Sequence, residues 1–196
     1  MASINDALNL VIPVRSNDSG VEIYAYHTPI SREVFEANYR PLAAAKSALS
    51  AKGVYYMMDA GPKIAALTLR DEGKKDAQEQ GDASDGGVSA LLGEIKRLTV
   101  ILAPSGGSWN MLPVDSAISQ GLIDADEWSE AESAIVFFTF HSALSRKADR
   151  ARVATATASV LKGWSTSSTP TEYIASLPTS MTSAATVSKA VSSVPS

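Results

Sequence analysis

The sequence contains only two histidines, the side chain best suited to acid–base chemistry near neutral pH. His141 lies between Phe140 and Ser142 in the most hydrophobic stretch, where a histidine satisfied within the core is the commoner role. His27 follows an apolar and aromatic run, and no aspartate or glutamate is adjacent to orient its ring. A Ser-His-Asp triad does not need neighbouring residues, but no Gly-x-Ser-x-Gly nucleophile elbow is present to favour one. The histidines therefore predict no catalytic site.

Two glycine-containing loops have the composition of ligand-binding loops without their decisive residues. Ser105-Gly106-Gly107-Ser108 lacks the Gly-Lys-Ser/Thr that grips phosphates, so it predicts a flexible connection. The loop at 82–87 resembles a calcium loop, but the twelfth position is Gly93 instead of glutamate. The chain also has no cysteine, which excludes disulfides, thiolate catalysis and cysteine-ligated zinc. We therefore expect no cofactor and no metal.

Two clusters of charged residues could bind a ligand or perform acid–base chemistry. The acidic cluster comprises Asp124, Asp126, Glu127, Glu130 and Glu132. It falls at the start of a predicted helix, where negative charge is favourable, so we prefer this structural role to paired catalytic carboxylates. The basic cluster comprises Arg146, Lys147, Arg150 and Arg152. It is the best nucleic-acid candidate, but it also suits a helix C-terminus, and a net charge of −4 disfavours phosphate binding.

The spacing of apolar residues predicts that the elements that position these residues are mostly helices. The runs at 8–14 and 21–26 predict a β-hairpin, with Pro13 at an edge or an interruption. Helices are predicted at 31–53 (kinked or split by Pro41), from 63 onward, and at 88–104, 114–120, 124–144 and 151–162. Asp124 and Glu127 have the spacing of a capping box, and the helix at 128–144 is apolar nearly all round. We expect this helix to be the most buried.

The predicted fold is mainly α with a small N-terminal β-hairpin (α+β), built as a helical bundle domain with a Ser/Thr-rich C-terminal tail. The 196 residues divide into a hairpin segment at 1–30, a helical domain at 31–163 and a flexible tail at 164–196. Tyr173, Ile174 and Leu177 could form one anchoring turn within that tail. No signal peptide is visible, and the apolar stretch at 134–144 is about half the ~20 residues that span a bilayer, so we expect no membrane segment.

Segments along nearly the whole chain resemble a family of tailed-phage proteins, the tail assembly chaperones. They include HTPISREVFE at 27–36 and GPKIAAL at 61–67, and further segments at 4–14, 94–99, 132–141, 176–180 and 192–196. The resemblance implies a non-enzymatic protein that binds and solubilises the tape-measure protein and helps to recruit tail-tube subunits. It also implies action in the cytoplasm of the infected bacterial host and absence from the finished particle. The alternative is a minor structural protein of the virion, in the tail or neck.

A chaperone of this kind needs exposed apolar anchors instead of a catalytic cleft. Aromatic and methionine side chains adapt well to interfaces, so they are the candidate partner-binding residues, although core packing is an alternative for each. These residues are Tyr24, Tyr26, Tyr55, Tyr56, Met57, Met58 and Trp109. The oligomeric state is left open by the sequence.

Overall fold

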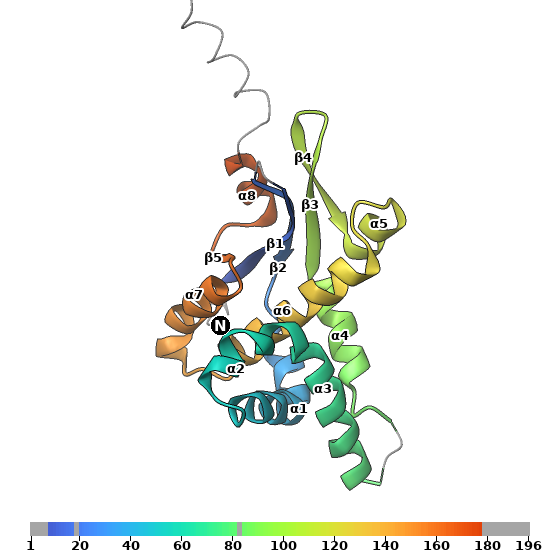
Figure 1. Cartoon of the computed structure of the whole chain (residues 1–196), viewed down its shortest axis with the longest axis vertical. Coiled ribbons are helices and arrows are strands. Elements are labelled where there is room, and N and C mark those ends of the chain that lie inside the picture. The colour runs from blue at the N-terminus through green and yellow to red at the C-terminus, as the bar shows by residue number, and fades with distance from the viewer. Residues whose placement is uncertain (1–7, 18–19, 82–83, 178–196) are drawn as a thin grey trace, which may run out of the picture.

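A computed structural model describes residues 8–17, 20–81 and 84–177 of the chain (Figure 1). The strands are β1 (Asn9–Asn17), β2 (Gly20–His27), β3 (Thr99–Ser105), β4 (Ser108–Pro113) and β5 (Trp164–Thr166). The helices are α1 (Arg32–Ser50), α2 (Val54–Met58), α3 (Ala60–Glu79), α4 (Val88–Arg97), α5 (Val114–Ser119), α6 (Ala125–Ala143), α7 (Arg150–Val160) and α8 (Pro170–Ser176), with a 3₁₀ turn η1 (Lys147–Asp149) before α7. The five strands form one antiparallel sheet in the order β4-β3-β2-β1-β5.

The prediction of a mainly α-helical bundle with a small N-terminal hairpin is wrong, because the fold is α+β with strands spread along the chain. The helix predicted at 88–104 ends at Arg97, and β3 starts at Thr99. Leu98 and Leu102 fit helical spacing, but the β-branched residues between them favour a strand. Pairing β3 between β2 and β4 then satisfies its backbone groups.

The predicted flexible connection at 105–108 is the tight turn of the β3–β4 hairpin. Gly106 and Gly107 have φ values of 58° and 86°, and Ser105 pairs with Ser108 across the turn. Two consecutive left-handed residues are what a two-residue hairpin turn requires, and glycine adopts them without steric cost. The four-residue sequence therefore specifies a turn.

Each face of the sheet contributes to a different hydrophobic cluster because side chains alternate along a strand. Leu10, Ile12, Ala25 and Ile101 point toward the main core, which the larger helices cover. Within that core α6 contacts α1, α3, α4, α7 and β1, and Figure 1 shows it passing between the sheet and the α1–α3 helices. It has 11 buried residues, more than any other described helix, so the expectation that this is the most buried helix is confirmed.

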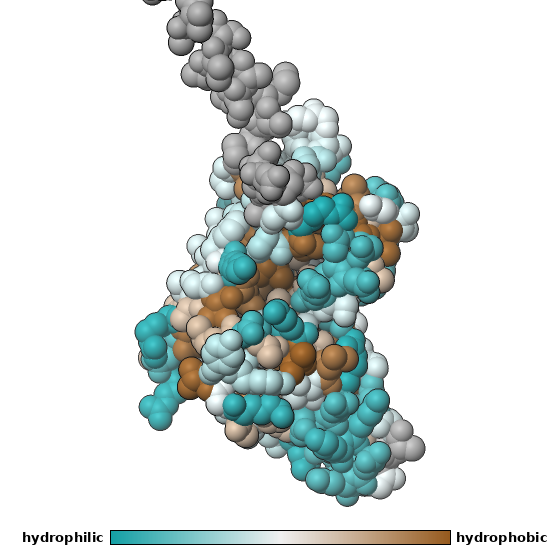
Figure 2. Space-filling view, in the orientation of Figure 1, coloured by the Kyte–Doolittle hydropathy of each residue, from teal (hydrophilic) through white to brown (hydrophobic). Residues whose placement is uncertain are grey.

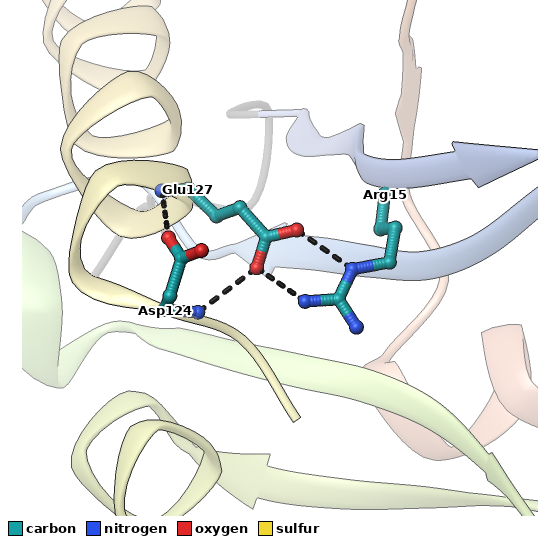
Figure 3. Close-up of polar contacts among 3 residues, drawn as sticks. All are labelled: Arg15, Asp124 and Glu127. Carbon is teal, nitrogen blue, oxygen red and sulfur yellow. Dashed lines mark hydrogen bonds and ion pairs between the residues drawn. The ribbon is translucent and has the colours of Figure 1, made fainter. Parts of the chain in front are cut away.

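The capping box at the start of α6 is confirmed, and it continues into an ion pair with β1 (Figure 3). The Glu127 backbone N–H donates to the Asp124 carboxylate at 2.8 Å, and the Asp124 N–H donates to the Glu127 carboxylate at 2.9 Å. Arg15 donates to both oxygens of Glu127, at 2.7 and 2.6 Å. These hydrogen bonds lower the pKa of Glu127, and those from Arg15 have the largest effect. The contact fixes the N-terminus of α6 against β1.

Two further sequence expectations are affected by the structure. Pro41 does not split the first helix, because it lies inside α1, which runs without interruption from Arg32 to Ser50. The basic cluster at 146–152 lies beyond the end of α6, on η1 and the first turn of α7. Its charges therefore do not complement the α6 dipole, and Arg152 instead pairs with Asp149 at 2.8 Å.

Residues 164–177 of the expected tail form β5 and α8 against the sheet. Gly163 brings the chain close to β1, because a Cβ at this position would lie 2.2 Å from the Val11 carbonyl oxygen. The anchoring turn considered around Tyr173 is helix α8, which begins with a capping box between Thr169 and Glu172. Tyr173 is buried on the second face of the sheet. The rest of the tail, 178–196, lies outside the described residues.

Candidate partner-binding surface

Neither histidine has a carboxylate partner among the described residues. His27 is fully buried, and its Nδ1 lies 3.0 Å from Thr99 Oγ1. Because the Thr99 hydroxyl donates to the Ile95 carbonyl at 2.7 Å, the Nδ1–H of His27 must donate to Thr99. His141 Nδ1 donates to the Phe137 carbonyl at 2.8 Å. Both rings are therefore held by structural contacts within the described part of the chain.

Three of the five residues of the acidic cluster are likewise engaged in structural contacts. Asp124 and Glu127 form the capping box, and the nearly buried Glu132 accepts from Arg70 at 2.6 Å. Asp126 and Glu130 are exposed on the surface of α6. Residues 8–17, 20–81 and 84–177 hold no group of three His, Cys, Asp or Glu side chains that could bind a metal ion.

The seven candidate partner-binding residues fall into two separate groups. Tyr24, Tyr26 and Trp109 lie on the second face of the sheet, whereas Tyr55, Tyr56, Met57 and Met58 lie on α2. The two groups differ in how much of each side chain remains free for a partner.

The sheet group is part of an aromatic cluster that attaches α8 to the sheet. The Tyr24 ring centroid lies 5.5 Å from those of both Trp109 and Trp164, and Tyr26 lies 5.9 Å from Tyr173. Tyr26 is fully buried and its hydroxyl donates to the Ser168 carbonyl. Burial raises the pKa of Tyr26 to about 12, so the hydroxyl keeps its proton and remains a donor. The ring of Tyr26 therefore has no free surface for a partner.

The α2 group has the opposite environment. Gly53, with φ of 98°, turns the chain after α1, and its carbonyl accepts from the Met57 N–H at 3.1 Å. Tyr56 and Met57 then pack against the main core. Tyr55 and Met58 point outward and are 84% and 57% exposed.

Val54 joins this exposed face, although the sequence reasoning did not select it. It is 80% exposed, so three large hydrophobic side chains lie open to solvent within five consecutive residues. Scattered exposed hydrophobics are ordinary, but neighbouring ones mark interaction surfaces. The signal available in the sequence was the Gly53 break before VYYMM, which leaves one short helix with too few positions to bury all its apolar residues. We call Val54, Tyr55 and Met58 the α2 triad.

Figure 2 shows hydrophobic residues gathered in a band on the face that carries α2, between the sheet and the α1–α3 helices. Helix α2 contacts both of its neighbours along the chain, α1 and α3. Ser50 Oγ at the end of α1 donates to Met57 Sδ at 3.9 Å. The triad therefore stands on packed helices, which lowers the conformational entropy that binding would cost.

No protein-family model, curated protein or solved structure matches this chain. None of the described helices has the length and apolar character that crossing a membrane would require.

Proposed function

We propose that this protein is a non-enzymatic phage tail assembly chaperone that binds an apolar helical segment of the tape-measure protein. In this role it keeps that protein soluble in the host cytoplasm and helps to recruit tail-tube subunits. The observation that carries the proposal is the α2 triad, which presents Val54, Tyr55 and Met58 to solvent on a helix with no buried residue. The resemblance of segments such as 27–36 and 61–67 to tail assembly chaperones supports the choice of partner.

The energetics of the triad suit reversible binding. Full burial of an exposed aliphatic or methionine side chain contributes about 1.5–3 kcal/mol. Because Val54 and Met58 are 80% and 57% exposed, burying both would contribute about 2–4 kcal/mol. Tyr55 adds a large ring with few rotatable bonds, a residue type enriched among the strongest contacts of interfaces. An apolar stripe on a partner helix would cover all three side chains, since residues spaced three and four apart share one helix face.

The test is co-expression with the tape-measure protein, followed by sedimentation and pull-down at low and high salt. The wild type should keep the tape-measure protein in the supernatant, and the complex should persist at high salt because apolar contacts are not screened. The double variant Tyr55→Ala/Met58→Ala should weaken the complex by roughly 30-fold or more, the loss expected when interface anchors are truncated. Met111→Ala is the matched control, because Met111 is also exposed but lies on β4.

An equally insoluble tape-measure protein with and without this partner, and no recovered complex, would overturn the proposal. Purified virions test the alternative role, because a chaperone should be missing from the particle. A stoichiometric amount of this chain in mature virions would instead assign it as a minor structural protein.

A further inference from the structure

The α2 triad lies in a basic stretch of an otherwise acidic protein. The whole chain has 21 acidic and 17 basic residues, yet residues 37–58 contain Arg40, Lys46 and Lys52 and no aspartate or glutamate. Arg40 pairs with Asp76 of α3 at 3.4 Å. Within the described part of the chain, Lys46 and Lys52 form no ion pair with any carboxylate.

Lys52 lies beside α2, and Lys46 lies on α1, the helix that contacts α2. Lys52 Nζ is 5.5 Å from the centroid of the Tyr56 ring, so its charge stands over the helix that carries the triad. Lys46 is one helical turn before Ser50, on the same side of α1, and Ser50 contacts Met57. The next cation along the chain, Lys63, is already neutralised by Asp59 at 3.4 Å. The chain that leads into α2, from Lys46 to Lys52, therefore carries two positive charges without acidic partners in the described residues.

Partial burial has a further consequence for Lys46. It lowers the pKa of the Lys46 ammonium, which means that the charged form has lost part of its hydration. A carboxylate supplied by a partner would replace that hydration. A basic partner would instead be repelled by both lysines.

We propose that the α2 surface selects an amphipathic helix whose apolar stripe is flanked by acidic side chains. The stripe covers Val54, Tyr55 and Met58, and the flanking carboxylates pair with Lys46 and Lys52. This inference rests on the proposed function and specifies the chemistry of the partner segment.

The experiment measures binding of the full chain to two synthetic helical peptides by fluorescence anisotropy. Both peptides carry the same apolar stripe, and they differ only in having glutamate or lysine at the flanking positions. Exposed ion pairs are worth about 0.2–1 kcal/mol each, so two pairs should make the glutamate peptide bind about twofold to 30-fold more tightly at low salt. High salt should reduce this preference while leaving the apolar part of the binding.

The double variant Lys46→Gln/Lys52→Gln should bind the two peptides equally. Lys74→Gln is the matched control, because Lys74 is also exposed but lies 15 residues beyond Asp59, about 22 Å along α3. It should keep the wild-type preference.

Three outcomes would overturn the inference. Equal binding of both peptides by the wild type would show that charge plays no part in selection. If tape-measure solubility in co-expression still depended on Tyr55 and Met58, the proposed function would survive that result. Tighter binding of the lysine peptide would show that the surface selects basic instead of acidic flanking side chains. Binding to phosphatidylserine-containing vesicles, with no binding to either peptide, would assign the surface to an anionic membrane.

Discussion

Mild acid should destabilise the folded protein through His27. This imidazole is fully buried at the end of β2, and burial lowers its pKa to about 3. Its Nδ1–H donates to Thr99, while Nε2 is buried without a hydrogen-bond partner in the described structure. A proton added at Nε2 would place a positive charge in the apolar core, which is why the neutral form is retained.

The direction of the pH effect follows from comparing the two states. In the unfolded chain the pKa of a histidine is about 6.5, so between that pH and about 3 the unfolded state binds a proton that the folded state does not. The stability that neutral His27 contributes is therefore fully present above the pKa of the unfolded chain, and it is lost as the pH falls from that value toward the folded pKa. Between about pH 7.5 and about pH 5.5 the loss from His27 is about 1.4 kcal/mol in the free energy of unfolding.

Other groups can be separated from His27 in this window. His141 acts in the same direction, because burial lowers its pKa too, so it can add at most a similar amount. The carboxylate of Glu127, whose pKa is lowered by Arg15, loses its stabilising effect only as the pH approaches about 4.3, the unfolded value for glutamate. That value lies below the window, so the two histidines dominate the change.

Urea unfolding at both pH values measures the effect in the wild type, His27→Phe and His141→Gln. Phenylalanine keeps a planar aromatic ring without a titratable nitrogen, and the Thr99 hydroxyl can still donate to the Ile95 carbonyl. In His27→Phe the difference in unfolding free energy between the two pH values should therefore be about 1.4 kcal/mol smaller than in the wild type. His141→Gln should keep the roughly 1.4 kcal/mol that His27 contributes to this difference. Wild-type pH dependence in His27→Phe would refute the argument that His27 is neutral and buried.

Two further predictions concern the two hydrophobic clusters. Phe138→Ala should cost about 3–5 kcal/mol in denaturant unfolding, because Phe138 is 1% exposed within α6, and a loss below about 1 kcal/mol would contradict this. Leu67→Ala, at an exposed position of α3, is its control and should change stability by less than about 0.5 kcal/mol. Tyr173→Ala removes the ring packed 5.9 Å from Tyr26 and 6.2 Å from Trp164, and it should cost about 3 kcal/mol and open 164–170 to limited proteolysis. Unchanged resistance of that segment to protease would show that α8 does not depend on this contact.

Local signals in the sequence were sufficient wherever one element specifies itself. The Asp124–Glu127 capping box, the apolar surface of α6 and the N-terminal hairpin all follow from residues close together in the chain. The short helix at 114–119 and the turn anchored by Tyr173 were also predicted in this way. In each case the deciding interactions span only a few residues, so spacing and residue type predict them.

The same reasoning predicted part of the candidate surface. Tyr55 and Met58 were selected as possible anchors because of their residue types, and the structure places both in solvent. Residue type could not separate them from Tyr26, which is an aromatic candidate like Tyr55 but packs against Tyr173 of α8. Exposure depends on which distant segment covers a side chain, and single-sequence patterns do not contain that information.

The sequence alone therefore determined the composition and net charge, the absence of cysteine chemistry, and the helices with strong local signals. The five-stranded sheet depended on contacts between distant segments. β3 pairs with β2 across more than 70 residues, as in His27 with Thr99, and β5 pairs with β1 across more than 150, as in Val11 with Trp164. A strand gains its hydrogen bonds only from such partners, whereas a helix forms them within itself, so the helical spacing of Leu98 and Leu102 was overridden once β2 and β4 were in place.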